Sequence, residues 1–162
     1  MTDHKIHAVI GVWYRDGKTF YVRRSATMEN YPNVWSLLSI QFKPSTFAHD
    51  TDSEVVQSLM EQMSRERLSG VGIEIVRYLS SAHCFHNPMN KSVYLHMFQV
   101  ELDDEPELNP DYYADCAWLT PEEYSERSRG GTCGLCLRMW SDYSVRHSLA
   151  ERPFAPALVS VE

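Results

Sequence analysis

The sequence predicts a single domain of the α/β class, in which strands come before and after one central helix. Its 162 residues suit one domain of ordinary size with one hydrophobic core. Segments rich in Val, Ile and aromatic residues lie on both sides of an amphipathic stretch at residues 52–73. Neither an internal repeat nor a domain linker is visible. We therefore expect one α/β sandwich over residues 1–152, followed by a C-terminal tail over residues 153–162.

The first half of the chain contains the signals of three strands. Residues 5–14 (KIHAVIGVWY) read as a strand, and residues 19–24 (TFYVRR) alternate and pair back as the second. Asp16-Gly17 between them is a strong hairpin signal. Residues 34–42 (VWSLLSIQF) are apolar enough to predict a buried strand.

The stretch at residues 52–73 predicts the central helix and the turn that ends it. Its apolar side chains recur at helical spacing and form one face; they are Val55, Val56, Leu59, Met60 and Met63. At about 100° per residue, Glu54, Glu61 and Arg65 fall on the opposite face. Thr51 and Glu54 have the spacing of a capping box. Gly70 and Gly72 are two stop signals.

The second half predicts three more strands and two helices. We expect strands at 73–80, 92–100 and 113–119, with a loop over residues 83–91 (HCFHNPMNK). Thr120-Pro121-Glu122-Glu123 predicts a helix start, with Thr120 as N-cap, Pro121 in the first position and acidic residues in the first turn. Residues 133–149 are expected to form the last helix.

The composition excludes several classes of protein. Apolar residues make up 43% of the chain and charged residues 23%, which is typical of a soluble globular protein. The formal net charge of −7 argues against a general nucleic-acid or anionic-membrane surface. It is compatible with a small phosphorylated ligand held by a few arginines. No apolar run approaches about 18 residues, and the N-terminus lacks a signal-peptide pattern. We expect a cytoplasmic protein with no membrane span; the oligomeric state stays open, and a homodimer is one alternative.

The four cysteines are expected to be reduced thiols in such a compartment. They are Cys84, Cys116, Cys133 and Cys136. Cys133 and Cys136 form a CxxC pair, which together with the histidines near Cys84 could bind zinc. Because no second pair matches it, core or surface thiols are the better interpretation.

Three segments together resemble the Nudix hydrolase family. Val22-Arg23-Arg24-Ser25-Ala26, followed by Tyr31-Pro32-Asn33-Val34-Trp35, is similar to the second strand and loop of the branch that holds isopentenyl-diphosphate isomerases and related hydrolases. Trp118-Leu119-Thr120-Pro121-Glu122-Glu123 is similar to the common Nudix ending before the last helix. The central helix lies where the catalytic box helix belongs. The resemblance covers residues 5–147 and implies a Nudix-like α/β/α sandwich with a mixed sheet.

The catalytic box itself departs from the family pattern, G-x5-E-x7-R-E-U-x-E-E-x-G-U, where U is apolar. Read from the end of the helix, four residues match the Arg-Glu and Gly-U positions: Arg65, Glu66, Gly72 and Ile73. In this register Ser69-Gly70 replaces the Glu-Glu pair and Arg67 replaces the apolar position. Read instead from Val55-Val56, the helix packs better, but Ser58-Leu59 then replaces Arg-Glu.

The spacing of the glutamates limits the metal site in every register. The three helix carboxylates of the box are separated by three, four and one residues, whereas Glu54, Glu61 and Glu66 are separated by seven, five and twelve. At most one of them can therefore occupy one of these three positions. The family uses Mg²⁺ or Mn²⁺, which require several oxygen ligands. Asp50, Asp52 and Glu54, with Glu61, are the candidates for a replacement metal site; a helix cap and a solvated helix face are the alternative interpretation.

The resemblance also implies the remaining site residues. Glu61, Arg65 and Glu66 are the candidates for catalysis. Substrate binding is expected at Arg23, Arg24, Tyr31, His83 and His86, because arginines suit phosphates, a tyrosine can stack on a flat ring and a histidine can act as base or ligand. For each of them a structural or surface role is the alternative.

Two functions from different classes follow. The first is a divergent Nudix-type hydrolase that cleaves a diphosphate linkage in a nucleotide-derived or other small diphosphate, with a reduced Mg²⁺ or Mn²⁺ site. The second is a catalytically silent Nudix-fold domain, without a required metal, that binds a nucleotide-like ligand or a protein partner. The family favours the first and the carboxylate spacing favours the second, because fold resemblance alone does not establish chemistry.

Overall fold

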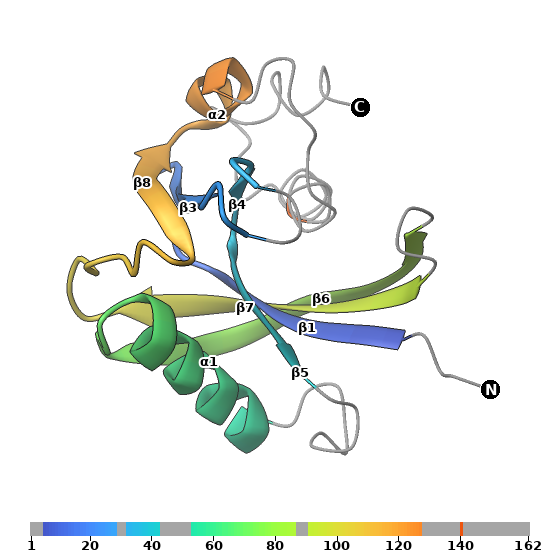
Figure 1. Ribbon diagram of the computed structural model, residues 1–162. Coiled ribbons are helices and arrows are strands. Elements are labelled where there is room, and N and C mark those ends of the chain that lie inside the picture. Colours follow the sequence, from blue (N-terminus) through green and yellow to red (C-terminus); the bar gives the residue numbers. More distant parts are fainter. Residues whose placement is uncertain (1–4, 29–31, 43–52, 87–90, 128–139, 141–162) are drawn as a thin grey trace. The chain divides into compact units, whose positions relative to one another are not determined.

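The computed structural model describes residues 5–28, 32–42, 53–86, 91–127 and 140 (Figure 1). Its residues group into two compact units. The first comprises residues 1–11 and 39–106, and the second comprises residues 12–38 and 107–162. The predicted tail at residues 153–162 and most of the predicted last helix lie outside the described residues; Trp140, which is helical, is the exception. The single-domain boundary at residue 152 stays a prediction.

The first unit is built on a four-stranded sheet in the order β5-β1-β7-β6. Its strands are β1 (Lys5–Val12), β5 (Leu38–Phe42), β6 (Ile73–His86) and β7 (Lys91–Leu102). One helix, α1 (Ser53–Arg67), lies along this sheet (Figure 1). The order of strands before and after one helix confirms the predicted α/β class.

The second unit is built on a smaller sheet around β3 (Lys18–Arg24). This strand pairs antiparallel with β2 (Tyr14–Arg15), β4 (Trp35–Ser36) and β8 (Tyr113–Leu119). Helix α2 (Pro121–Arg127) follows β8. The predicted hairpin is confirmed, because Tyr14 pairs with Thr19 across Asp16 and Gly17, whose φ angles are 54° and 77°. Positive φ at both central residues is the geometry that Asp-Gly favours.

Two predicted strands are each divided in two by a change of partner. The predicted strand at 5–14 breaks at Trp13, where β1 ends and β2 begins. The predicted strand at 34–42 breaks at Leu37, between β4, which pairs with β3, and β5, which lies beside β1. Both break residues are buried, so hydrophobicity continues across each break and hides it in the sequence.

The loop predicted over residues 83–91 is wrong for most of its length. Strand β6 continues to His86 and β7 begins at Lys91, so that Cys84 pairs with Val93 and His86 pairs with Lys91. The turn signal Asn87-Pro88 suggested the loop, but main-chain pairing with β7 extends the strand up to His86.

Helix α1 packs through the apolar face that its spacing predicts. Val56, Met60 and Met63 are buried. Gly11 of β1 lies beneath the helix: a Cβ at this position would come within 3.1 Å of Met60 Sδ. A glycine here therefore allows the close approach of helix and strand.

The end of α1 follows the predicted stop signals. Both Leu68 N and Gly70 N donate to Ser64 O, at 2.8 Å and 2.9 Å, and Ser69 and Gly70 have positive φ angles of 58° and 74°. Gly72 lies against Asp103, where an added Cβ would clash with Oδ2. The left-handed turn and the close contact together lead the chain from α1 into β6.

The start of α2 confirms the predicted cap. Thr120 Oγ1 accepts from Glu123 N at 3.2 Å, and Glu123 Oε1 accepts from Thr120 N at 2.9 Å. This reciprocal pair is a complete capping box. The corresponding box predicted at Thr51 and Glu54 lies outside the described residues at Thr51.

Candidate functional site

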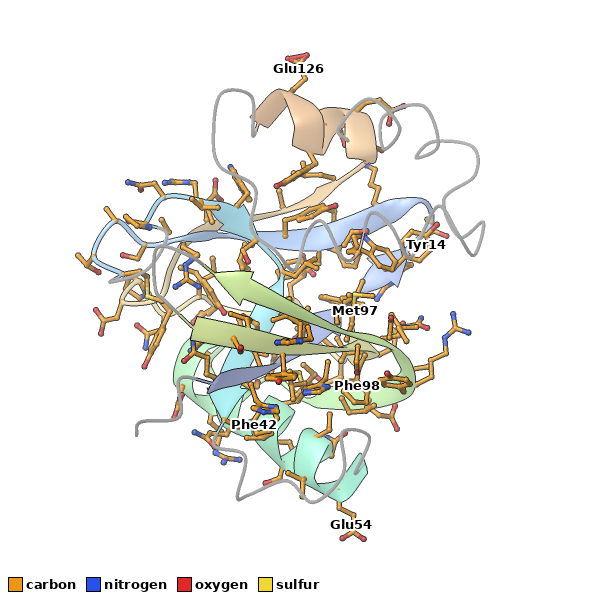
Figure 2. The ribbon with its side chains drawn as sticks, turned by 90° about the vertical axis from the view of Figure 1, so that its right-hand side faces the viewer. Tyr14, Phe42, Glu54, Met97, Phe98 and Glu126 are labelled. Carbon is orange, nitrogen blue, oxygen red and sulfur yellow. The ribbon has the colours of Figure 1, made fainter. Side chains whose placement is uncertain are left out.

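Helix α1 lies between β5 and β6 in the chain, where the resemblance leads us to expect the catalytic box helix. The candidates Glu54, Glu61, Arg65 and Glu66 are all exposed on this helix. Glu54 points away from the sheet at the start of the helix (Figure 2). These side chains are therefore open to solvent and belong to one element of the first unit.

Glu61 is held by a glutamine that also contacts β6. Gln57 Nε2 donates to Glu61 Oε2 at 2.9 Å and to Ile73 O at 2.8 Å, and Gln57 Oε1 accepts from Ile75 N at 3.0 Å. The amide thus bonds to a main-chain oxygen and a main-chain N–H of β6, which lies at the end of the described strand order. Because both of its polar atoms are used, Gln57 fixes the helix against the strand and orients Glu61.

Sequence reasoning did not single out Gln57, although the box pattern contains the signal. The arginine of the box lies eight positions after its first glutamate. Counted back from Arg65, that glutamate position falls on Gln57. A neutral amide of the same size therefore stands where the family pattern has a carboxylate, and here it has a structural role.

Glu66 also accepts a hydrogen bond from a glutamine one turn earlier. Gln62 Nε2 donates to Glu66 Oε2 at 3.1 Å, and both side chains are exposed. Arg65 is exposed beside them. Ser69 and Gly70, which stand where the Glu-Glu pair belongs in this register, lie beyond the helix in the left-handed turn. The last turn of α1 therefore presents one carboxylate and not a cluster.

The described carboxylates of α1 do not fit a Mg²⁺ or Mn²⁺ site. Glu54 and Glu61 share a face but lie about 10 Å apart along the helix axis, and Glu66 is rotated by about 140° from Glu61. Such a cation needs several oxygen ligands within about 2.6 Å. Among the residues that the structure describes, no group of three or more His, Cys, Asp or Glu side chains could hold a metal ion. Asp50 and Asp52, the other metal candidates, lie outside the described residues.

Arg67 explains how the helix tolerates a charged residue at an apolar box position. It is half-buried, and its Nη1 donates to Ser39 O of β5 at 2.9 Å. The guanidinium satisfies a main-chain oxygen, and its aliphatic stem can pack beside the apolar face. Arg67 therefore ties α1 to β5 while Gln57 ties it to β6.

Two of the arginine candidates lie in the second unit, at the end of β3. Arg23 Nη1 donates to Asn33 Oδ1 at 3.3 Å, and this contact is exposed. The main chain of Arg24 pairs with the following loop, because Arg24 N donates to Val34 O and Asn33 N donates to Arg24 O. Both arginine side chains are half-buried. Tyr31, the other candidate in this loop, lies outside the described residues.

The histidine candidates belong to the first unit, on β6. His83 is exposed, and its ring stacks on Tyr94 at 4.2 Å between centroids and 5° between planes. His86 ends the strand and pairs through its main chain with Lys91. Glu61, Glu66 and His83 thus belong to the first unit, and Arg23 and Arg24 belong to the second.

Comparison with solved structures identifies the fold. The chain is similar to the MutT protein from Methanosarcina mazei Go1, with a TM-score of 0.67 and 14% identity over 94% of this chain and 99% of that one. It is also similar to a Nudix hydrolase from Nitrosomonas europaea, with a TM-score of 0.66 and 12% identity over 86% of this chain and 88% of that one. The chain has the Nudix fold.

A third solved structure with similarity to this Nudix-fold chain is the C-terminal domain of mouse MUTYH in complex with human PCNA. Its TM-score is 0.54, with 14% identity over 90% of each chain. No protein-family model matches the sequence, and comparison with curated proteins gives no match. The resemblance to Nudix proteins is therefore confirmed for the fold, while the likeness to the isopentenyl-diphosphate isomerase branch stays a prediction.

The Nudix fold alone does not establish the chemistry of α1. No helix among the described residues is long and apolar enough to cross a membrane. Cys116, the cysteine whose side chain is described, is half-buried and is not part of a disulfide. The zinc alternative rests on the other cysteines and stays a prediction.

Proposed function

We propose that this chain is a Nudix-fold domain that binds a small phosphorylated, nucleotide-like ligand and does not hydrolyse it through a metal on α1. The observation that carries this proposal is the arrangement of the helix glutamates and of their hydrogen-bond partners. Glu61 and Glu66 each accept a hydrogen bond from a glutamine one turn earlier, and they lie on different faces of α1. They serve as partners of neighbouring amides and do not converge on a common point.

The chemistry of the ligand is inferred from the second unit. A guanidinium carries five N–H donors, and the bond from Arg23 to Asn33 uses one of them. Planar donor pairs of this kind suit phosphate oxygens. A ligand held by an arginine needs no metal, so binding at β3 is compatible with the absence of a carboxylate cluster among the described residues of α1.

The MUTYH domain supports a binding role for this fold, because its structure was determined in complex with another protein. A protein partner is accordingly the alternative to a small ligand. A protein partner would bind without any dependence on nucleotide.

The second candidate function is a divergent hydrolase that cleaves a diphosphate linkage with Mg²⁺ or Mn²⁺. The fold favours this candidate, because the chain is similar in structure to the Nudix hydrolase from Nitrosomonas europaea. Such a metal would have to take ligands from Asp50 and Asp52, with Glu54 at the start of α1. In that case Glu61 and Glu66 would contribute little.

One screen distinguishes these functions. The full chain is incubated with nucleoside di- and triphosphates and sugar nucleotides, and both phosphate release and thermal stability are measured. We expect a ligand to raise the melting temperature equally with Mg²⁺ and with EDTA, without turnover. Arg23→Gln should remove the shift, whereas the exposed Arg65→Gln should keep it.

Three outcomes would contradict the proposal. Turnover that is lost in Glu61→Gln or Glu66→Gln but kept in the control Glu105→Gln would restore α1 as the metal site. Turnover that survives both helix variants would favour the divergent hydrolase with ligands elsewhere. If no ligand changes the melting temperature, the proposal of a small ligand is wrong and the alternative of a protein partner remains.

A further inference from the structure

A hydrogen-bonded row of side chains crosses three strands of the first unit, away from the glutamates of α1. It runs from Tyr78 and Ser81 on β6 to His96 on β7 and His7 on β1. Tyr78 Oη donates to Ser81 Oγ at 2.8 Å, Ser81 Oγ lies 3.0 Å from His96 Nδ1, and His96 Nε2 lies 3.3 Å from His7 Nδ1. The hydroxyl of Ser81 and the imidazoles of His96 and His7 thus follow one another along the row.

A bulge in β6 makes this row possible. Tyr78 pairs with Phe98 and Ser80 pairs with Met97, so Leu79 is an extra residue in the strand. Side chains three residues apart normally point to opposite faces of a strand. The bulge reverses the alternation and brings Tyr78 and Ser81 to one face, where Ser81 is the direct cross-strand partner of His96.

The two middle members of the row, Ser81 and His96, differ in exposure in the way that a reactive group and its base require. Ser81 is exposed, whereas His96 is only 2% exposed. The ring of His96 is fixed by His7, which stacks on Tyr94 at 4.7 Å, and by Phe42 at 6.0 Å. A base that is buried, oriented by a third group and within hydrogen-bond reach of an exposed hydroxyl has the arrangement of an activated nucleophile.

Two arrangements of the protons satisfy these contacts. In one, Ser81 donates to His96 Nδ1 and His96 Nε2 donates to His7 Nδ1. In the other, the protons point the opposite way and Ser81 only accepts. Because Ser81 already accepts from Tyr78, its own proton is available for His96 in the first arrangement. That arrangement leaves the acceptor nitrogen of His96 facing the serine.

We propose that Ser81 is a nucleophile towards activated acyl esters, with His96 as its general base and His7 as a positioning residue. Ser81 Oγ forms a bond to the carbonyl carbon of the ester while its proton moves to His96 Nδ1. The bond from that carbon to the leaving oxygen breaks, and the alcoholate departs with the electron pair. The products are an acyl-serine, a protonated His96 and the alcoholate. This activity is independent of the proposed ligand site.

The test uses the full chain and p-nitrophenyl acetate. Nitrophenolate release is followed by absorbance, and the acetylated residue is located by peptide mass spectrometry. We expect acetyl on Ser81, none at that position in Ser81→Ala, and a rate lower by about a hundredfold in His96→Asn, which has no basic nitrogen. The control Ser58→Ala removes an exposed serine of α1 and should change nothing.

A second pair of variants keeps the test decisive if His96→Asn does not fold. His7→Phe retains a ring that can stack on Tyr94 but removes the acceptor for His96, and it should slow acetylation. His7→Asn returns an acceptor near the same point and should recover part of the rate. The proposal is overturned if acetyl is found on a histidine or lysine in place of Ser81. Equal rates of Ser81 acetylation in His7→Phe, His7→Asn and the unchanged chain would also overturn it.

Discussion

Gln57 Nε2 donates a hydrogen bond of 2.8 Å to the main-chain oxygen of Ile73, and so connects the middle of α1 to the start of β6. The same amide accepts from Ile75 N at 3.0 Å. The side chain therefore bonds to β6 through both polar atoms, in the way that a neighbouring strand would. The family pattern has a glutamate at this position when the box is read from the end of the helix.

Restoring that glutamate should destabilise the protein. In Gln57→Glu the donor to Ile73 O is lost and a second carboxylate faces Glu61 one turn away. We expect a loss of about 1–2 kcal/mol in the free energy of unfolding, from a lost hydrogen bond and a like-charge pair. The control is Gln62→Glu, which creates the same like-charge pair with Glu66 but leaves the bonds from Gln57 to β6 in place. Urea unfolding measures the free energy of unfolding of both variants. Equal losses would show that the bond from Gln57 to β6 does not stabilise the protein.

Arg67 should contribute more to stability than its neighbour Arg65. Arg67→Met removes the donor to Ser39 O, which leaves a half-buried main-chain oxygen without it. We expect a loss of about 1–3 kcal/mol. Arg65→Met, on the exposed side of the same helix, should change stability by less than about 0.5 kcal/mol. The ordering is checked by denaturant unfolding of the two variants, and a reversed order would show that the bond to β5 is unimportant.

Gly72 should be sensitive to substitution because of Asp103. An added Cβ meets Asp103 Oδ2, while the carboxylate also accepts from Gly72 N at 3.1 Å. Gly72→Ala should therefore cost about 1 kcal/mol or more, and less when Asp103→Ala is already present. Gly70→Ala, which meets no atom within 4 Å but has a φ of +74°, should cost the same in both backgrounds. A double-mutant cycle followed by thermal unfolding gives the coupling, and no coupling at Gly72 would refute the contact.

Because the pKa of Tyr14 is raised, we expect the protein to lose stability in alkali. Partial burial raises the pKa of Tyr14 above 10.0, and Asp16 raises it further. Because the pKa is higher in the folded chain than in the unfolded one, the contribution of Tyr14 is complete below the ordinary tyrosine pKa and is lost as pH rises through the folded value. Tyr14→Phe keeps the ring contact with Trp140 and should flatten the fall in stability above about pH 10. Parallel curves for the two proteins would disprove this.

The sequence predicted those elements whose signals are local. Asp16-Gly17 specified its hairpin through backbone conformation, and Thr120 with Glu123 specified the start of α2 through their own hydrogen bonds. The apolar spacing of Val56, Met60 and Met63 predicted the buried face of α1.

Features that depend on distant partners could not be predicted in this way. Trp13 and Leu37 are apolar residues within apolar runs, and only the strands on either side show that pairing changes there. Residues 83–86, which precede a turn signal in the sequence, form strand because β7 pairs with them. Gln57 and Arg67 looked like departures from a catalytic pattern, and their roles emerge only from contacts with Ile73 and Ser39.

The central claim is that the glutamates of α1 do not form a metal site. It is tested most directly by measuring Mn²⁺ binding to the full chain by electron paramagnetic resonance, with Glu61→Gln/Glu66→Gln as the variant and Glu105→Gln as the control. We predict that the unchanged chain and the double variant give the same amount of free Mn²⁺ at every concentration. Tight binding that disappears in the double variant and persists in the control would contradict the claim.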